Sequence, residues 1–496
     1  MSDSPEPASA RGQEQEGAGV WATLREAVRG TEQDLTAVSI RRAVVLLAVP
    51  TVLEMSMESL LTVVDIFFVS RLGSDAVATV GLTEAMLSPV YALAMGLSAA
   101  ATALIARHTG AKEPDRAARA AVQVIGLAFV LAALFGILGV VLAPRLLAAM
   151  GASPSIVATG SSYTGVMLGG SLTIFLLFVV NAVFRAAGDA ASAMRSLWLA
   201  NILNMLLAPC FVFGLGPFPK LGVLGAAVAM TLSRAIGVAY QGSTLLRGKT
   251  RLALTRAHVV MELPVIREIV KVATPATGQV LIETASWLAL VRIISTFGSA
   301  ALAGYTIAMR IAIFALLPSW GLAMAAATLV GQNLGAKQPD RAARSVWTIA
   351  KYNVAFLGPV GVAFAVAPLA LVSFFTSDVA TSTHAVDCLR IVALGFVVFA
   401  FGMVAVQAFN GAGDTTTPML VNLASFWGFK IPLAWVLSKS MGMGPHGVFL
   451  AITAAYAFQS TTAFVLFRRG KWRSATPAGS DACHPIDDAA SGPTES

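Results

Sequence analysis

Long apolar runs separated by short polar stretches follow one another along most of the 496-residue chain. Each run has about 20 residues or more, the length that an α-helix needs to cross a bilayer. Polar and apolar residues seldom alternate at every second position, which disfavours a membrane β-barrel. The pattern therefore predicts twelve transmembrane helices, at 43–70, 78–106, 121–143, 156–184, 191–215, 222–246, 269–296, 302–332, 347–373, 386–410, 417–438 and 447–467.

Composition supports a chain that lives in a bilayer. Hydrophobic residues make up 56% and charged residues only 12% of the sequence, whereas soluble proteins have about 45–50% and about 25%. Most soluble enzymes and secreted disulfide scaffolds are thereby excluded. Polar residues dominate at both ends, so 1–40 and 471–496 are predicted to be cytoplasmic tails. We expect the first tail to be disordered, with a short amphipathic helix within 20–40 as the alternative.

The formal net charge of +8 arises from basic residues at the ends of the apolar runs. Such clusters indicate topology, because cytoplasmic loops are enriched in Lys and Arg, and they give no reason to expect a nucleic-acid partner. Counting Arg185 with the basic cluster between the fourth and fifth runs, the bias places both termini in the cytoplasm of a plasma-membrane protein. Cysteines and histidines show no metal-ligand spacing, so we expect no bound metal and no cofactor.

An internal repeat divides the chain into two halves. The segment GAKEPDRAAR at 110–119 recurs as GAKQPDRAAR at 335–344, and the same shift along the chain, the repeat offset, links Glu58 to Glu283. We predict an N-lobe at 41–247, a cytoplasmic linker at 248–267 and a C-lobe at 268–470. In the repeated loop, Gly is expected to end one helix, Pro-Asp to begin the next, and Arg to anchor at the lipid headgroups.

Two six-helix lobes have an even number of spans each, so they point the same way and are related by a pseudo-two-fold axis along the membrane normal. Duplicated lobes of this kind are typical of transporters, with the substrate pathway at their interface. A receptor or channel does not need the duplication. A membrane-embedded enzyme would need catalytic residues, and the sequence contains neither H-E-x-x-H nor G-x-S-x-G.

Several acids interrupt the apolar runs. Glu54, Glu58 and Asp65 lie within about 40° of one another around the first predicted helix. Each ionised acid at the bilayer centre costs roughly 2.5–3.5 kcal/mol, so this face should point into a cavity. We predict cation coupling by these three acids and by Glu283. The alternative is that some are simply hydrogen-bonded or lie near the membrane surface.

Other residues within the runs suit a cavity wall or a hinge. Pro50 and Pro275 remove helix hydrogen bonds at matched places and are predicted hinges, although fixed kinks would serve packing equally well. Lys430 is either a partner for an acid or a snorkelling side chain. The neutral and aromatic residues predicted to line the substrate cavity are Asn181, Asn201, Asn204, Gln279 and Trp287.

These features together resemble the multidrug and toxic compound extrusion (MATE) family across roughly residues 40–470. The resemblance rests on the twelve runs in two halves, on VVDIFFVSRLGSDAVATVGL at 63–82, and on FxxxGD elements at 184–189 and 409–414. It is nearest to the DinF-type branch. It implies a monomer in the lipid bilayer that exports small organic compounds, often cationic and amphiphilic, in exchange for protons or sodium ions. A lipid-linked precursor flippase of the same superfamily is the alternative.

The resemblance also assigns residues. The family's first-helix acid falls on Asp65. DinF-type members often carry N-I-x-L-D-P in the fifth helix, where this chain reads NMLLAP at 204–209, so Ala208 replaces an acid. NorM-type members use a seventh-helix acid, which falls on Glu283, and a tenth-helix acid, whose position near Phe399 has none. Both sodium sites thus lack a ligand, which favours proton coupling through Asp65 and rocker-switch alternating access.

Overall fold

The computed structural model describes residues 19–30, 33–248, 252, 254, 255, 258 and 261–474. Secondary structure in this part of the chain is helical, and eleven of its helices are long and apolar enough to cross a membrane. A further pair, bent by 59°, makes a twelfth span. The predicted all-α membrane fold is confirmed, and each of the twelve predicted runs falls on a span.

The first six spans are α3 (Ile40–Ser70), α4 (Ser74–Gly110), α5 (Pro114–Ala149), α6 and α7 (Pro154–Gly169 and Ser171–Ala186, one span), α8 (Ala190–Phe213) and α9 (Val223–Leu246). The second six begin with α10 (Leu263–Ser295), α11 (Ser299–Gly335) and α12 (Pro339–Val366). The tenth span is the bent pair of α14 (Val379–Ala393) and α15 (Phe396–Ala412), the eleventh covers Thr416–Ser440, and the twelfth is α18 (Pro445–Arg468). The eleventh span combines α16 (Thr416–Asn422), the π-helix η3 (Leu423–Lys430), α17 (Ile431–Trp435) and the π-helix η4 (Val436–Ser440). The short helix α13 (Pro368–Val372) follows α12.

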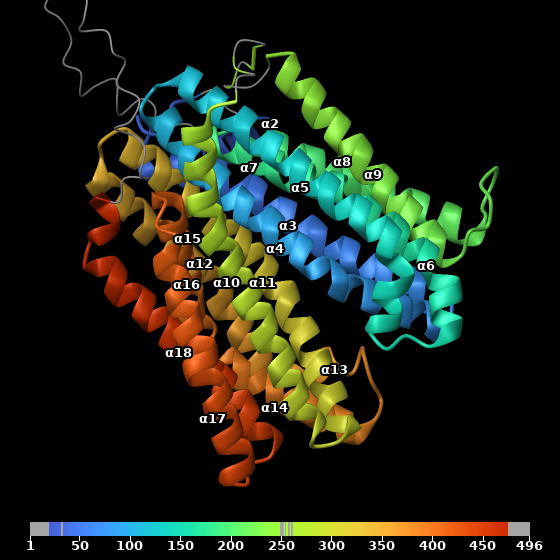
Figure 1. Cartoon of the computed structure of the whole chain (residues 1–496). Coiled ribbons are helices and arrows are strands. Elements are labelled where there is room, and N and C mark those ends of the chain that lie inside the picture. The colour runs from blue at the N-terminus through green and yellow to red at the C-terminus, as the bar shows by residue number, and fades with distance from the viewer. Residues whose placement is uncertain are drawn as a thin grey trace, which may run out of the picture.

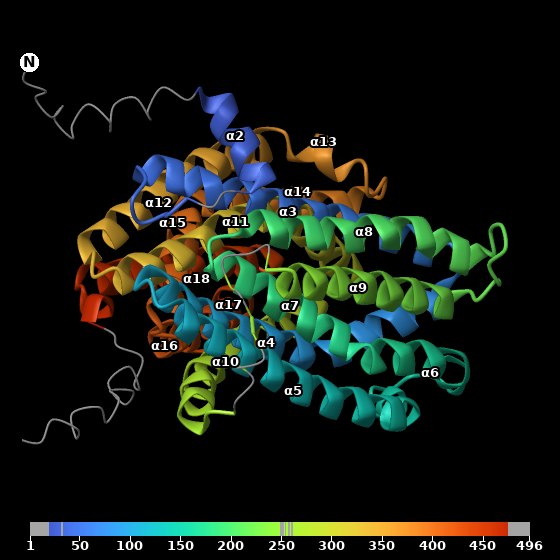
Figure 2. The same cartoon turned by 90° about the horizontal axis from the view of Figure 1, so that it is seen from above.

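The two lobes meet at one end and diverge toward the other (Figure 1). Seen from above, α5, α6, α8 and α9 lie on one side and α10 to α18 on the other (Figure 2). The beginning of α3 packs in one apolar core with α11, α12 and α15, and the beginning of α10 packs in another with α4 and α5. The start of the first helix of each lobe thus packs in the core of the other lobe.

Two glycines related by the repeat form the closest approach between the lobes. A Cβ atom at Gly110 would lie 1.9 Å from the carbonyl oxygen of Gln332, and one at Gly335 would lie 1.9 Å from that of Arg107. The repeat offset relates Gly110 to Gly335 and Arg107 to Gln332. The two contacts are therefore one contact made twice around the pseudo-two-fold axis, as the repeat predicted.

The glycines of the repeated loop are the last residues of α4 and α11, as expected. The left-handed conformation that follows is taken by Lys112 (φ 61°) and Lys337 (φ 56°), so the glycines serve the lobe contact and not a left-handed cap. Pro114 and Pro339 do begin α5 and α12, as predicted. Some bulky residues in the second halves of α3 and α10 are exposed, among them Leu60, Phe67 and Leu288.

The expectation of a disordered first tail is wrong for Val20–Arg29, which form the short helix that was the alternative. Helix α2 (Val20–Arg29) is ten residues long, and Glu26 pairs with Arg42 at 2.8 Å. Ala27 and Leu35 are almost fully buried, in a core shared with α11, α12 and Trp472. Ala27 and Leu35 pack against α11 and α12 in the folded protein. The polar composition of the segment does not predict this packing. Residues 1–18 and 475–496 lie outside the described part of the chain.

The segment between α2 and α3 also ties the two lobes together. Asp34 pairs with Lys112 at 3.5 Å, and Arg341 donates hydrogen bonds to the carbonyl oxygens of Leu35 and Val38. Lys112 and Arg341 belong to the first and second copies of the repeated loop, respectively. The predicted headgroup anchor Arg341 therefore binds backbone carbonyls of this segment.

We predict that Gly110→Ala and Gly335→Ala each destabilise the protein, because the added methyl group would meet a backbone carbonyl that cannot move alone. Overpacking of this kind costs about 1–3 kcal/mol. Thermal unfolding of the purified protein measures the effect. Gly242→Ala in α9, where the new methyl group would have nothing within 4 Å, is the matched control. Equal stability of all three variants would contradict a tight contact between the lobes.

Candidate functional site

The acids of α3 face α7 and α8, and each of them meets an asparagine there. The side-chain amide of an asparagine donates to each carboxylate: Asn181 to Glu54 at 3.1 Å, Asn201 to Glu58 at 3.0 Å, and Asn204 to Asp65 at 3.0 Å. The three asparagines were predicted to line a substrate cavity. The structure brings them together with the three acids, so amides and carboxylates form one polar seam within the N-lobe, and their role in a substrate cavity stays a prediction.

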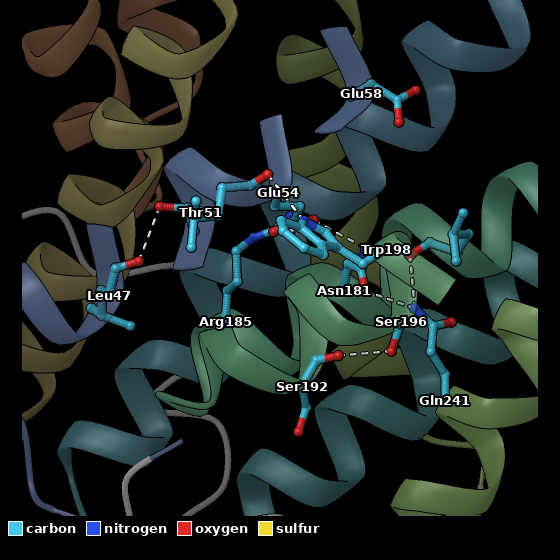
Figure 3. A network of polar contacts seen from close by, with 12 residues as sticks. Leu47, Thr51, Glu54, Glu58, Asn181, Arg185, Ser192, Ser196, Trp198 and Gln241 are labelled. Atoms are coloured by element: carbon cyan, nitrogen blue, oxygen red, sulfur yellow. Dashed lines mark hydrogen bonds and ion pairs between the residues drawn. The ribbon is translucent and has the colours of Figure 1, made fainter. Parts of the chain in front are cut away.

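The deepest part of this seam is an ion pair between Glu54 and Arg185. Arg185 Nη1 lies 2.7 Å from Glu54 Oε1, and the two residues are 6% and 2% exposed. Figure 3 shows both side chains beside Asn181, to whose side-chain oxygen Gln241 donates a hydrogen bond of 2.7 Å. Arg185 was counted among the basic residues that indicate topology, and the structure shows that its charge is engaged by Glu54. The residue ends an apolar run in sequence, but its side chain turns inward to a buried acid.

The C-lobe contains the same pair in neutral form. The repeat offset carries Glu54 onto Gln279 and Arg185 onto Asn410. Gln279 donates to the side-chain oxygen of Asn410 at 3.1 Å and to the backbone oxygen of Thr415 at 2.9 Å. One scaffold position thus holds an ion pair in one lobe and an amide pair in the other. We interpret Glu54 and Gln279 as residues that hold the first helix of each lobe against its neighbours.

Asp65, like Glu58, has one side-chain hydrogen-bond donor. Its side chain is partly exposed, and Asn204 is its hydrogen-bond donor. Within the described residues, the buried side-chain oxygen of Asn204 has no hydrogen-bond partner. Arg234 of α9 interacts electrostatically with Asp65 and donates to the hydroxyl of Tyr91 at 3.2 Å. The carboxyl therefore has a donor for its charged form and an unused acceptor beside it.

Glu283 occupies the wall of the C-lobe that corresponds to Glu58. It is exposed to solvent, and the hydroxyl of Tyr456 donates to it at 3.4 Å. Lys430 interacts electrostatically with Glu283 but is buried, with its ammonium 4.1 Å from the ring centre of Phe426. Lys430 thus faces an acid and an aromatic ring inside the lobe, which disfavours the snorkelling interpretation.

The remaining predicted residues lie apart from these clusters. Trp287 is 47% exposed on α10, and its part in a substrate cavity stays a prediction. Pro50 and Pro275 lie inside α3 and α10, as expected, and their action as hinges stays a prediction. Among the described residues, no three His, Cys, Asp or Glu side chains gather as a metal site would require. The acids are spread along the seam, each with its own donor.

Sequence reasoning missed Arg185, Arg234 and Tyr456 as partners of the acids. Arg185 and Asn410 each follow the Phe of an FxxxGD element, so their positions were in view, but the exchange of Arg for Asn hid their common role. Tyr456 and Arg234 lie in helices that are distant in sequence from the acids. No sequence spacing therefore connects them to Glu283 or Asp65.

A helical membrane protein with two lobes related by an internal repeat, and with paired acids in its lobe walls, belongs to the class of membrane transporters. The MatE family model matches residues 50–210 and 275–436. The chain therefore belongs to the MatE family, whose members are transporters and not enzymes.

Individual relatives cover almost the whole helical region. A probable multidrug resistance protein NorM from Thermotoga maritima is 27% identical over 87% of this chain and 93% of its own. An FAD transporter from Shewanella oneidensis is 24% identical over 82% and 89%. A solved outward-facing structure of a multidrug resistance MATE family transporter is 25% identical, with a TM-score of 0.84 over 89% of this chain and 98% of that one.

We predict that Arg185→Asn destabilises the protein by about 3–5 kcal/mol, because it leaves the Glu54 carboxylate buried and unpaired. The double variant Glu54→Gln, Arg185→Asn reproduces the amide pair that the C-lobe already uses and should recover most of the loss. Thermal unfolding midpoints of the two variants and the wild type measure this difference. A double variant as unstable as Arg185→Asn alone would contradict the shared structural role.

Proposed function

We propose that this transporter exports organic cations in exchange for protons, with Asp65 as the coupling acid. The observation that carries the proposal is the difference between the acids of α3. Glu54 is locked in a buried ion pair, whereas Glu58 and Asp65 are partly exposed with one amide donor each. Of those two donors, Asn204 beside Asp65 keeps a buried side-chain oxygen that has no partner among the described residues. A group that must gain and lose a proton once per cycle needs access to water and a partner in each state.

The neighbours of Asp65 suit both of its protonation states. When Asp65 is charged, the amide of Asn204 and the nearby Arg234 stabilise the carboxylate. When Asp65 is protonated, the unused side-chain oxygen of Asn204 can accept the new hydrogen after a rotation of the amide. The change in charge then alters the attraction between α3 and α9, and this provides the link from proton binding to helix movement.

The conformation supports alternating access of the rocker-switch type. The lobes are in contact at the end that carries both copies of the repeated loop, and the Lys and Arg clusters at this end favour a cytoplasmic location. In this interpretation both termini are cytoplasmic and the structure is closed toward the cytoplasm. Protonation of Asp65 from the outside would release the substrate, and reopening inward would return the proton to the cytoplasm.

The energy available from one proton is adequate for accumulation. One elementary charge that crosses a membrane potential of 100 mV releases about 2.3 kcal/mol, which corresponds to a concentration ratio of roughly fifty. A pH gradient adds to this.

A cationic substrate fits the charges better than an anionic one. Glu58, Asp65 and Glu283 are at least partly exposed, whereas Arg185 and Arg234 are buried and engaged. An FAD transporter or a flippase of lipid-linked pyrophosphates would need free cationic groups along its pathway. Multidrug export, as named for the NorM relatives, therefore fits this chain better than either anionic cargo.

We predict that Asp65→Asn abolishes proton-driven efflux of the cation tetraphenylphosphonium from reconstituted vesicles, because Asn cannot carry the proton. Asp75→Asn is the matched control, since Asp75 is an exposed acid in the first turn of α4, and its efflux should equal that of the wild type. Wild-type efflux by the Asp65→Asn variant would rule out this residue as the coupling acid.

A further inference from the structure

The ammonium group of Lys430 is a buried charge without a conventional partner. The residue is 2% exposed, at the end of the π-helix η3, and no other described residue makes a hydrogen bond or an ion pair with its side chain. Its ammonium lies 4.1 Å from the ring centre of Phe426 and 5.8 Å from that of Tyr456. An isolated buried cation is costly, so its retention next to an acid calls for an explanation.

The repeat shows how the surroundings of Glu283 differ from those of its N-lobe counterpart. In the N-lobe, Glu58 accepts a hydrogen bond from Asn201 at 3.0 Å. The repeat offset carries Glu58 onto Glu283 and Asn201 onto Phe426. The C-lobe acid has therefore lost its amide donor. In place of that donor stands an aromatic ring that carries an ammonium group on its face.

Tyr456 connects the two charges. Its hydroxyl donates to Glu283 at 3.4 Å, and its ring packs at 5.4 Å from that of Phe426, beneath Lys430. Lys430 lies outside ion-pair distance of Glu283 in this conformation, but its flexible four-carbon stem allows the ammonium to move toward the acid. Cation–π contacts with the two rings stabilise the ammonium while the carboxylate of Glu283 binds another partner.

We propose that Lys430 is a tethered cation that competes with free cations for the carboxylate of Glu283. Sodium ions are thereby excluded from this C-lobe site, and an organic cation that binds Glu283 is displaced when the ammonium of Lys430 returns. The part that concerns organic cations rests on the function proposed above. The exclusion of sodium does not, because it follows from the charges of Lys430 and Glu283 alone.

The first test uses sodium alone. Thermal unfolding of the purified full-length protein is compared in KCl and NaCl of equal ionic strength. We expect no sodium-dependent shift for the wild type or Lys430→Arg, and a rise in the midpoint for Lys430→Met that disappears in Lys430→Met, Glu283→Gln. Lys439→Met is the matched control, because Lys439 is exposed and lies 4.6 Å from the ring of Phe297, and it should behave as the wild type.

The second test uses tetraphenylphosphonium as the organic cation. Removing a like charge a few ångströms from the site should lower its dissociation constant about tenfold in Lys430→Met, with no change in Lys439→Met. Affinity that stays equal or falls in Lys430→Met would overturn the proposal.

A wild-type protein that sodium stabilises, with the effect lost in Glu283→Gln, would also overturn it. This comparison decides the matter even if Lys430→Met fails to fold, since a wild type that shows no sodium effect agrees with exclusion. Failure of the wild type to bind tetraphenylphosphonium would count against the proposed substrate class. It would not affect the conclusion from the sodium test.

Discussion

A carboxylate inside a bilayer must be paired, hydrogen-bonded or protonated, because its charge costs roughly 2.5–3.5 kcal/mol at the centre of a transmembrane helix. The arrangement of the lobes follows from this constraint. Glu54, Glu58 and Asp65 each bring an asparagine from α7 or α8 to α3. These polar bonds fix which side of α3 faces the lobe interior and leave its other side free to contact α11.

The two lobes satisfy this constraint differently, although they share one scaffold. The buried pair of Glu54 and Arg185 becomes an amide pair in the C-lobe, which shows that the position needs a bond across the helices but not a charge. The second acid is kept in both lobes, but its hydrogen-bond donor changes from Asn201 to Tyr456, and a lysine lies nearby on the ring of Phe426. Asp65 has no acidic counterpart, since Leu290 occupies its place. The two lobes thus share one duplicated helical scaffold, but the polar residues at corresponding positions differ.

Much of the fold could be predicted from the sequence, because hydrophobic runs and a repeat with a constant offset are local and readable. The close contact of Gly110 with Gln332 could not be predicted, because a glycine at the end of an apolar run is equally typical of a helix end without any such contact. The partner of Glu54 was missed for a related reason. Arg185 stands where basic residues usually mark the cytoplasm, and only packing shows that its side chain turns inward. Lys430 could be singled out as unusual, but the ring on which it rests comes from residue positions that a pattern does not connect.

The most direct test of the proposed coupling is transport of tetraphenylphosphonium into proteoliposomes under separately imposed gradients of pH and of sodium. Coupling through Asp65, with Lys430 closing the C-lobe to sodium, predicts that a pH gradient alone drives accumulation and that a sodium gradient alone does not. Accumulation driven by sodium at equal pH on both sides would contradict it.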